Sequence, residues 1–445
     1  MGRKRHFRIA CRKFKLKTFS GICIKISYRC GAQAAVGKNK VLQLSFANFR
    51  KGTYILVEGK EDTDRFFIIQ SGHVKIVHQN EIPGTPQEIL GPGDFVGVIS
   101  SMSLHSQIET VVALSDVVCI SVRRDQYSEL IEKNTPVALK IIRTFAHRMR
   151  MLNEILMKQT LNRSAVDQPA QIFNVAEYYY FQKQYDIACY AYYQYVKAVK
   201  TGPKAERALK MFRNLRQATK AVYFESNQDL LRVYPKGTMV FSESQSGADM
   251  FIIQEGSIKI SKIVDGTEVT LAMLKKGDMF GEMALLENKP RSASAIANDD
   301  CRLMTINKSN FNQMVSTQPQ LISRLTTMLA DRLWSMHRQL ANSLLNSNPV
   351  AKMTDMLALQ VEKMKIEFRK GTQYQTNLTV EDIATMCGLK KNEQMKYIYA
   401  FQNSSLFSLH GGKIFIPDCL ELVKQAAFYR KQSAKAAAAN ASSGI

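Results

Sequence analysis

The chain has 445 residues and is 45% apolar, which is enough for several hydrophobic cores and three or four domains. No run reaches the roughly 18 to 20 apolar residues of a transmembrane helix, so we expect no membrane partner. The eight cysteines are scattered without a Cys-x-x-Cys pair, which favours reduced thiols in a cytoplasm. The sequence contains no nucleophile–base pair, metal-ligand cluster or lysine-bearing phosphate loop, so we expect neither an enzyme nor a metal site.

Positive charge is concentrated at the amino terminus. Of the net charge of +23, residues 1–40 supply twelve Lys or Arg and no Asp or Glu. Such an extension is typical of a nucleic-acid-binding arm or an organelle transit peptide. Because the folded repeat begins only near Val41, we favour a third interpretation, in which translation starts later and residues 1–40 are not made.

Residues 41–160 read as short strands separated by glycine turns, followed by a long helix. The segments Phe67–Ile76 and Gly93–Gly97 mix β-branched and aromatic residues with glycine, as β-rolls do. After Pro136, apolar residues recur at helical spacing. The same motifs return about 184 residues later, so we expect two copies of one domain.

Residues 169–217, between the copies, alternate small and large side chains, chiefly Ala and Tyr. This spacing lets two antiparallel helices approach closely, and the segment resembles a tetratricopeptide-type helical hairpin. One hairpin cannot bury both of its faces, so it should pack on the rolls or continue through 205–215 as a partial second repeat. A groove for a partner peptide and a plain spacer both remain open.

The most informative motif lies in the second copy, between positions 277 and 293. Glu282 and Arg291 stand nine residues apart, with Gly281 beside the acid. Glycine permits a backbone conformation in which the following amides can approach a phosphate closely. Arg291 can hold phosphate oxygens, Ser292 adds a hydroxyl, and Glu282 can accept a hydrogen bond from a sugar hydroxyl.

This motif resembles the phosphate-binding cassette of the cyclic nucleotide-binding domain, and the likeness extends over residues 225–346. It implies that Glu282 holds the ribose 2′-hydroxyl and that Arg291 holds the cyclic phosphate. The implied ligand set is Gly281, Glu282, Met283, Ala284, Arg291 and Ser292. Cyclic AMP is favoured over cyclic GMP as the effector, although Ser292 suits either. Candidate contacts to the base, on the following helix, are Ser323, Thr326 and Thr327.

The first copy has other residues at the two key positions. Ungapped counting places Val98 where Glu282 stands and Gln107 where Arg291 stands. A neutral amide cannot replace a guanidinium for an anion, and valine offers a sugar no hydrogen bond. We therefore interpret residues 41–160 as a degenerate roll that has lost its ligand.

After Pro319, an apolar stripe that includes Leu321 and Leu344 predicts a helix of about 28 residues, or about 42 Å. This helix is longer than one roll needs. In the cyclic nucleotide-binding family such a helix closes over the base and pairs with its equivalent across a dimer. We expect either a homodimer or pairing of the two rolls within one chain.

Residues 350–430 are expected to form the output domain. Thr379 and Asp382 predict a capped helix, a second helix follows from Lys390 to Gln402, and 406–416 predicts a β-hairpin. The order resembles the winged helix-turn-helix of the Crp/Fnr (catabolite activator-like) family, whose second helix enters the major groove of DNA. The candidate DNA-binding residues are Thr379, Lys390, Lys391, Asn392, Gln394 and Lys396. The Ala/Ser-rich residues 431–445 are expected to be a disordered tail.

The predicted class is an α+β multidomain protein: two jelly-roll-like β-rolls, a tetratricopeptide-like hairpin between them and a winged helix-turn-helix. The predicted function is a cyclic nucleotide-responsive regulator of transcription that binds double-stranded DNA. The alternative is a regulatory protein of the kinase regulatory-subunit type, which would act through protein partners, since tandem rolls occur there too.

Overall fold

The computed structural model describes residues 44–78, 88–161, 168–224, 230–264, 266–343, 345, 348–364, 368–387, 389 and 391–442. The basic extension predicted at 1–40 lies outside these ranges. Within them, no helix combines the length and apolarity that crossing a bilayer requires.

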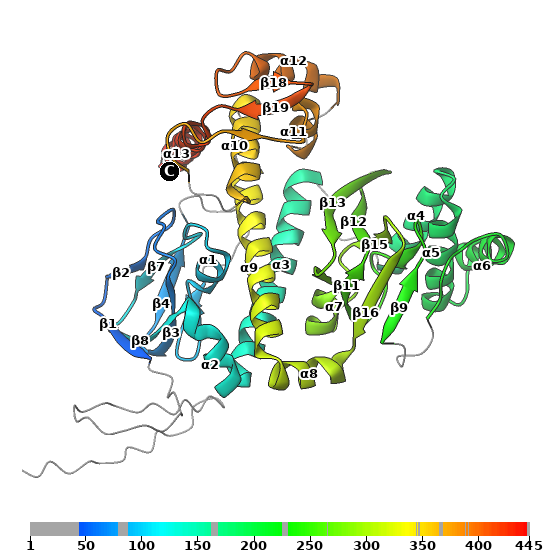
Figure 1. Ribbon diagram of the computed structural model, residues 1–445, viewed down its shortest axis with the longest axis horizontal. Coiled ribbons are helices and arrows are strands. Elements are labelled where there is room, and N and C mark those ends of the chain that lie inside the picture. The colour runs from blue at the N-terminus through cyan, green and yellow to red at the C-terminus, as the bar shows by residue number, and fades with distance from the viewer. Residues whose placement is uncertain are drawn as a thin grey trace, which may run out of the picture.

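The first roll consists of two antiparallel four-stranded sheets, ordered β1-β8-β3-β6 and β2-β7-β4-β5 (Figure 1). Its strands are β1 (Ser45–Phe49), β2 (Tyr54–Leu56), β3 (Arg65–Ser71), β4 (Val74–Val77), β5 (Ile89–Leu90), β6 (Phe95–Val96), β7 (Thr110–Ala113) and β8 (Val117–Arg123). Its helices are α1 (Val98–Ser103), α2 (Tyr127–Lys133) and the long α3 (Thr135–Leu161), with a 3-10 turn at Arg124–Gln126.

The second roll repeats this topology strand for strand. Its sheets have the orders β14-β11-β16-β9 and β10-β15-β12-β13, which match the first roll when β9–β16 replace β1–β8. The strands are β9 (Leu231–Tyr234), β10 (Met239–Phe241), β11 (Met250–Glu255), β12 (Ser257–Val264), β13 (Thr267–Lys275), β14 (Met279–Phe280), β15 (Ser294–Ala297) and β16 (Cys301–Ile306). The helices are α7 (Glu282–Glu287), α8 (Lys308–Thr317) and α9 (Pro319–Ser343). The predicted duplication of a β-roll is therefore confirmed.

Three helices, α4 (Gln168–Phe181), α5 (Tyr185–Ala198) and α6 (Pro203–Leu215), form a helical unit between the rolls in sequence. Their contacts are continuous, because α5 packs against both α4 and α6, so the helices extend beyond one hairpin. The unit lies on the second roll (Figure 1), where the Tyr190 hydroxyl donates to the Val240 carbonyl at 3.0 Å. The likeness of this unit to a tetratricopeptide hairpin stays a prediction.

The two long helices, α3 and α9, run side by side between the rolls (Figure 1), and we call their contact the helix seam. Each cassette helix crosses to the other roll's long helix: α1 packs on α9 and α7 packs on α3. Tyr127 and Thr326 share a buried hydrogen bond of 2.9 Å across this boundary. Trp334 of α9 stacks on His105 of the first roll, with 3.8 Å between ring centroids. Of the two expected modes of pairing, the structure therefore contains the intrachain one.

The C-terminal unit comprises α10 (Pro349–Glu362), α11 (Val380–Met386), α12 (Lys391–Gln402), α13 (Cys419–Ser442) and the sheet β17-β19-β18, with β17 (Tyr374–Gln375), β18 (Ser408–His410) and β19 (Lys413–Ile416). The predicted cap is confirmed, because Thr379 and Asp382 exchange hydrogen bonds of 3.1 and 2.8 Å. The disordered tail expected from residue 431 is wrong as far as Ser442, because α13 continues through it. Alanine has the highest helix propensity, so an Ala-rich segment extends a helix that has already begun.

A buried charge network joins α9 to the C-terminal unit. Asp355 of α10 is fully buried and accepts from Arg338 at 3.0 Å, from Asn342 at 3.1 Å and from Arg430 of α13. Arg338 also donates to Glu362 at 2.9 Å. Burial raises the pKa of Asp355, but the Arg338 and Arg430 guanidiniums lower that pKa by more, so it falls below its usual value of 3.8.

Replacing Asp355 with Asn should destabilise the chain by about 3 to 5 kcal/mol at neutral pH, because two guanidiniums lose their buried carboxylate. The folded-state pKa of Asp355 is depressed, so its contribution is complete above about pH 3.8 and is lost as pH falls through the lower folded value. Thermal unfolding followed by circular dichroism measures both effects. Glu421→Gln, at an exposed position on α13, is the matched control. Equal melting temperatures for the two variants would contradict the prediction.

Candidate functional site

The cassette of the second roll is built around Gly281, which precedes α7 and has a φ of +77°. A Cβ at this position would lie 2.8 Å from Nη1 of Arg291 and 3.2 Å from the carbonyl oxygen of Asp249. Both the backbone conformation and the lack of space require glycine. Gly281 therefore brings the start of α7 against the Arg291 guanidinium, as the spacing of the motif predicts.

Arg291 is a buried cation, with 6% of its surface exposed. Its Nη1 donates to the Gly281 carbonyl at 2.7 Å, and its guanidinium carbon lies 4.2 Å from the centre of the Phe241 ring. Among the described residues, no carboxylate forms an ion pair with it and its buried Nε has no hydrogen-bond partner. Burial lowers the pKa of Arg291 to about 10, although nearby Asp249 opposes the shift. A desolvated guanidinium in this state favours the arrival of an anion.

Glu282, which is 1% exposed, accepts a hydrogen bond of 2.8 Å from Nη1 of Arg332 on α9. Nη2 of Arg332 donates to the Met279 carbonyl at 2.7 Å. The expected acceptor for a ribose hydroxyl is therefore tied to the long helix. Sequence reasoning missed Arg332, although the 184-residue repeat places Arg148 at its equivalent position in the first copy.

The remaining predicted ligands fall into two groups. Met283, Ala284 and Ser292 lie in the cassette, with the Ser292 hydroxyl 3.8 Å from the Met283 sulfur. The expected base contacts on α9 differ in their surroundings. Thr326 is buried and bonded to Tyr127 and to the Ile322 carbonyl, so its hydroxyl faces the first roll. Ser323 and Thr327 are half-buried on the same helix.

The first roll keeps the shape of the cassette with different side chains. Gly97 has a φ of +77°, like Gly281, and α1 has the same length as α7. Gln107 donates to the Asp62 carbonyl at 2.6 Å. Arg148 pairs with Glu109 at 3.3 Å and with Glu88 at 2.9 Å. Glu109 thus stands two residues after Gln107, at the position where the second roll has Ala293. Its negative charge disfavours the binding of a phosphate.

The candidate DNA-binding residues are only partly described. Thr379 caps α11, Lys396 is exposed on α12, and the Gln394 amide donates to the Leu389 carbonyl at 2.7 Å. Lys390 lies outside the described residues, as do the side chains of Lys391 and Asn392. Sequence reasoning missed Met395 and Tyr399, which are 74% and 71% exposed. Their i, i+4 spacing, beside the buried Ile398, is the signal that places them on the outer face of α12.

Comparison with known proteins identifies the two rolls. The family model described as "Cyclic nucleotide-binding domain" matches residues 46–134 and 231–318. The chain contains two cyclic nucleotide-binding domains. It is 27% identical over 196 residues to a CRP-like cAMP-activated global transcriptional regulator of Mycobacterium tuberculosis, covering 43% of this chain and 86% of that protein.

Two further similarities belong to different kinds of protein. A cAMP-dependent protein kinase regulatory subunit of Mycosarcoma maydis is 35% identical over 119 residues, 26% of this chain and 22% of that protein. Among solved structures, the catabolite activator protein of Thermus thermophilus is 23% identical, with a TM-score of 0.26, and covers 45% of this chain and 90% of that one.

Arg291→Ala should weaken the binding of cyclic AMP at least about tenfold, because a charge-assisted hydrogen bond contributes about 1.5 to 3 kcal/mol. Gln107→Ala, at the equivalent position of the first roll, is the matched control and should leave the affinity unchanged. Isothermal titration calorimetry should give one site per chain. A stoichiometry of two would show that the first roll also binds the nucleotide, and a stoichiometry of zero would remove the site from the second.

Proposed function

We propose that this protein is a cyclic nucleotide-responsive, DNA-binding regulator of transcription, with cyclic AMP as the preferred effector. One observation carries the proposal: Arg291 is a buried cation that forms no ion pair with a carboxylate in the described ranges, beside a cassette whose Glu282 is bonded to α9. The phosphate would meet Arg291 and the ribose would meet Glu282. A ribose hydroxyl at Glu282 must share that carboxylate with Arg332, so the ligand acts on the long helix.

The route from the cassette to the C-terminal unit runs along α9. Arg332 and Arg338 stand six residues apart on α9, and Arg338 bonds to Asp355 of α10 at 3.0 Å. Asn342, on the next turn, donates to the Lys352 carbonyl at 2.8 Å and to Asp355 at 3.1 Å. A free-energy difference between two arrangements of α9 at the cassette must therefore appear at α10 and α13.

The C-terminal unit is proposed to bind DNA as a winged helix-turn-helix, with α12 in the major groove. In support, α11 and α12 are followed by the hairpin β18–β19, in the order of that motif. Lys396 suits a phosphate or guanine, and the exposed Met395 and Tyr399 suit the methyl group of thymine. The excess of Lys and Arg in residues 350–445, thirteen against eight Asp and Glu, agrees with phosphate contacts.

A kinase regulatory-subunit role is the second candidate. The tandem rolls and the match to a fungal kinase regulatory subunit favour it. That match covers 22% of its relative, whereas the match to the bacterial regulator covers 86%. The C-terminal unit, with its exposed α12, also needs a role that inhibition of a kinase does not supply. We therefore place DNA binding first.

Cyclic AMP should change the affinity of the full chain for duplex DNA by about five- to 150-fold, the usual range for coupled sites. Lys396→Ala should weaken binding about equally for all sequences if the side chain meets phosphate. Fluorescence anisotropy with genomic fragments, at two salt concentrations, measures both effects. Lys431→Ala, at an exposed position on α13, is the control. Absence of duplex binding at low salt, with and without nucleotide, would reject the transcriptional role.

The chain should bind a single DNA half-site as a monomer. Dimeric regulators place two reading helices about 34 Å apart on DNA, but here the helix seam joins two rolls to one C-terminal unit. Analytical ultracentrifugation should give a monomer. A duplex with one half-site should bind the chain with the same affinity per site as a duplex that carries the inverted repeat. Cooperative binding of two chains to the inverted repeat would contradict this expectation while leaving DNA binding intact.

A further inference from the structure

A cavity of about 520 Å³ lies between the helical unit and the second roll. Its walls come from α5, the segment 222–224, β9 and the loop that joins β10 to β11. Much of this lining lies outside residues 231–318, which the cyclic nucleotide-binding domain model covers. Glu282 and Ser292 are not part of the lining but Arg291 is, so the cavity adjoins the cassette without coinciding with it. Its volume lies in the range of about 300 to 1,000 Å³ that is typical of small-molecule sites.

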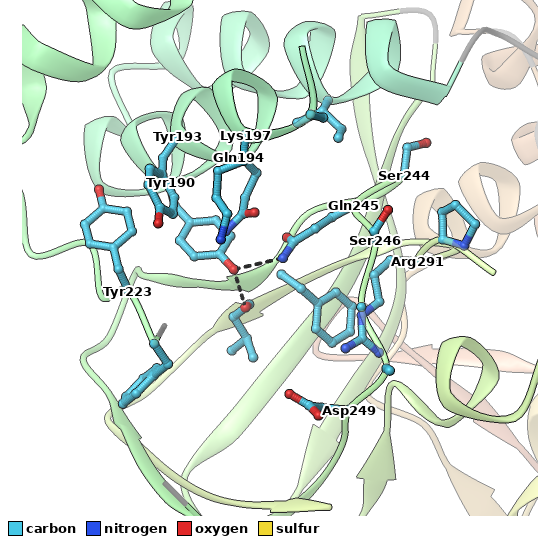
Figure 2. Close-up of a pocket in the computed structure, with 18 of the residues that line it drawn as sticks. Tyr190, Tyr193, Gln194, Lys197, Tyr223, Ser244, Gln245, Ser246, Asp249 and Arg291 are labelled. Carbon is cyan, nitrogen blue, oxygen red and sulfur yellow. Dashed lines mark hydrogen bonds between the residues drawn. The ribbon is translucent and has the colours of Figure 1, made fainter. Parts of the chain in front are cut away.

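One side of the cavity is aromatic. Tyr190 and Tyr193 of α5 face it together with Tyr223, and Figure 2 shows the three rings on the side opposite Arg291. The rings of Tyr190 and Tyr223 are nearly parallel, with centroids 6.0 Å apart, while Tyr193 meets Tyr223 edge-on at 4.7 Å. Such an arrangement offers both faces and edges of π-systems to a flat ring.

The lining as a whole carries a positive charge. Arg232 and Asp249 form an ion pair of 3.6 Å and neutralise each other. Arg291 and Lys197 remain as the cationic groups of the lining, and Lys197 lies 5.3 Å from the centre of the Tyr193 ring. The charge balance of the lining therefore favours an anion.

Arg291 borders the cassette and the cavity with different edges of its guanidinium. Nη1 faces Gly281 in the cassette, at 2.7 Å from its carbonyl oxygen. The opposite edge faces Gly247 in the cavity wall, where a Cβ would lie 2.9 Å from Nη2 and 3.1 Å from Nε. This Nε is the buried donor that has no partner in the described structure. An unsatisfied buried donor at a cavity wall is satisfied when a ligand supplies an acceptor.

We propose that this cavity is a second ligand site, which takes a small aromatic anion. The ring lies against Tyr190, Tyr193 and Tyr223, and the anionic group lies toward Arg291, with Lys197 at the edge of the site. Occupancy of the cavity and of the cassette are coupled, because both ligands interact with one guanidinium, and this coupling alone rests on the proposed function. The helical unit is thereby a part of a binding site rather than a spacer.

The test uses phenyl phosphate as the probe and the full chain, with binding followed by saturation-transfer NMR and calorimetry. We expect one site with a dissociation constant of about 1 mM, typical of so small a ligand. Benzyl alcohol, which lacks the charge, and inorganic phosphate, which lacks the ring, should each bind at least fivefold more weakly. Tyr193→Ala and Lys197→Gln should each weaken phenyl phosphate at least threefold.

Matched controls are available on α5 and in the segment that follows it. Tyr185→Ala and Lys200→Gln alter exposed residues of the same types that do not line the cavity, and they should leave binding unchanged. No saturable binding, or equal losses in the control variants, would overturn the proposal. Binding that is insensitive to Tyr193 and Lys197 but fully displaced by cyclic AMP would also overturn it, because the probe would then occupy the cassette. If the chain binds phenyl phosphate but not cyclic AMP, the nucleotide effector is rejected and the proposed cavity site stands.

Discussion

The pairing of α3 with α9 is the interaction on which the rest of the molecule depends. Its apolar side chains, including Phe145, Leu329 and Leu333, are fully buried and belong to one core that reaches from the first roll to the C-terminal unit. Each such side chain contributes about 1.5 to 3 kcal/mol on burial, whereas an exposed ion pair contributes about 1 kcal/mol or less. The helix seam therefore holds the two rolls as one body and fixes which roll each cassette helix touches.

Within this body the two rolls share a backbone and differ in chemistry. Gly97 and Gly281 adopt the same left-handed conformation, and a six-residue helix follows each. The equivalent arginines, Arg148 and Arg332, both bind buried carboxylates, but those carboxylates come from different positions. In the first roll the ion pair of Arg148 with Glu109 stands in place of the unpaired cation that an anionic ligand would need. The first roll contacts the second through its long helix α3 and its cassette helix α1.

Arg291 occupies an unusual position in the electrostatics of the second roll. Most buried charges in the described part of the chain are paired: Asp355 binds two guanidiniums, and Glu282 binds Arg332. Arg291 instead rests on the Phe241 ring and a single carbonyl oxygen. The desolvation of this guanidinium is only partly offset by the protein itself, which is the physical reason that both adjoining spaces favour negatively charged ligands.

The sequence by itself determined the features that depend on neighbouring residues. Glycine turns between runs of β-branched residues predicted both rolls. The Thr379–Asp382 pair predicted the start of α11. The motif around Gly281 predicted which side chains meet in the cassette. These signals are local because turn conformations, helix caps and strand periodicity are set within a few residues. Local composition gave a wrong prediction at the end of α13. The Ala-rich sequence there was interpreted as disorder, although the helix continues.

Only the tertiary structure decided the contacts between distant segments. The bond from Arg332 to Glu282 spans 50 residues, and the one from Tyr127 to Thr326 spans 199. The sequence placed Thr326 on the correct helix but could not say that its hydroxyl faces the first roll. The cavity beside α5 likewise exists because the helical unit packs on one particular face of the second roll. Which face of a helix meets which sheet depends on the packing of whole surfaces, and no local pattern of residues specifies it.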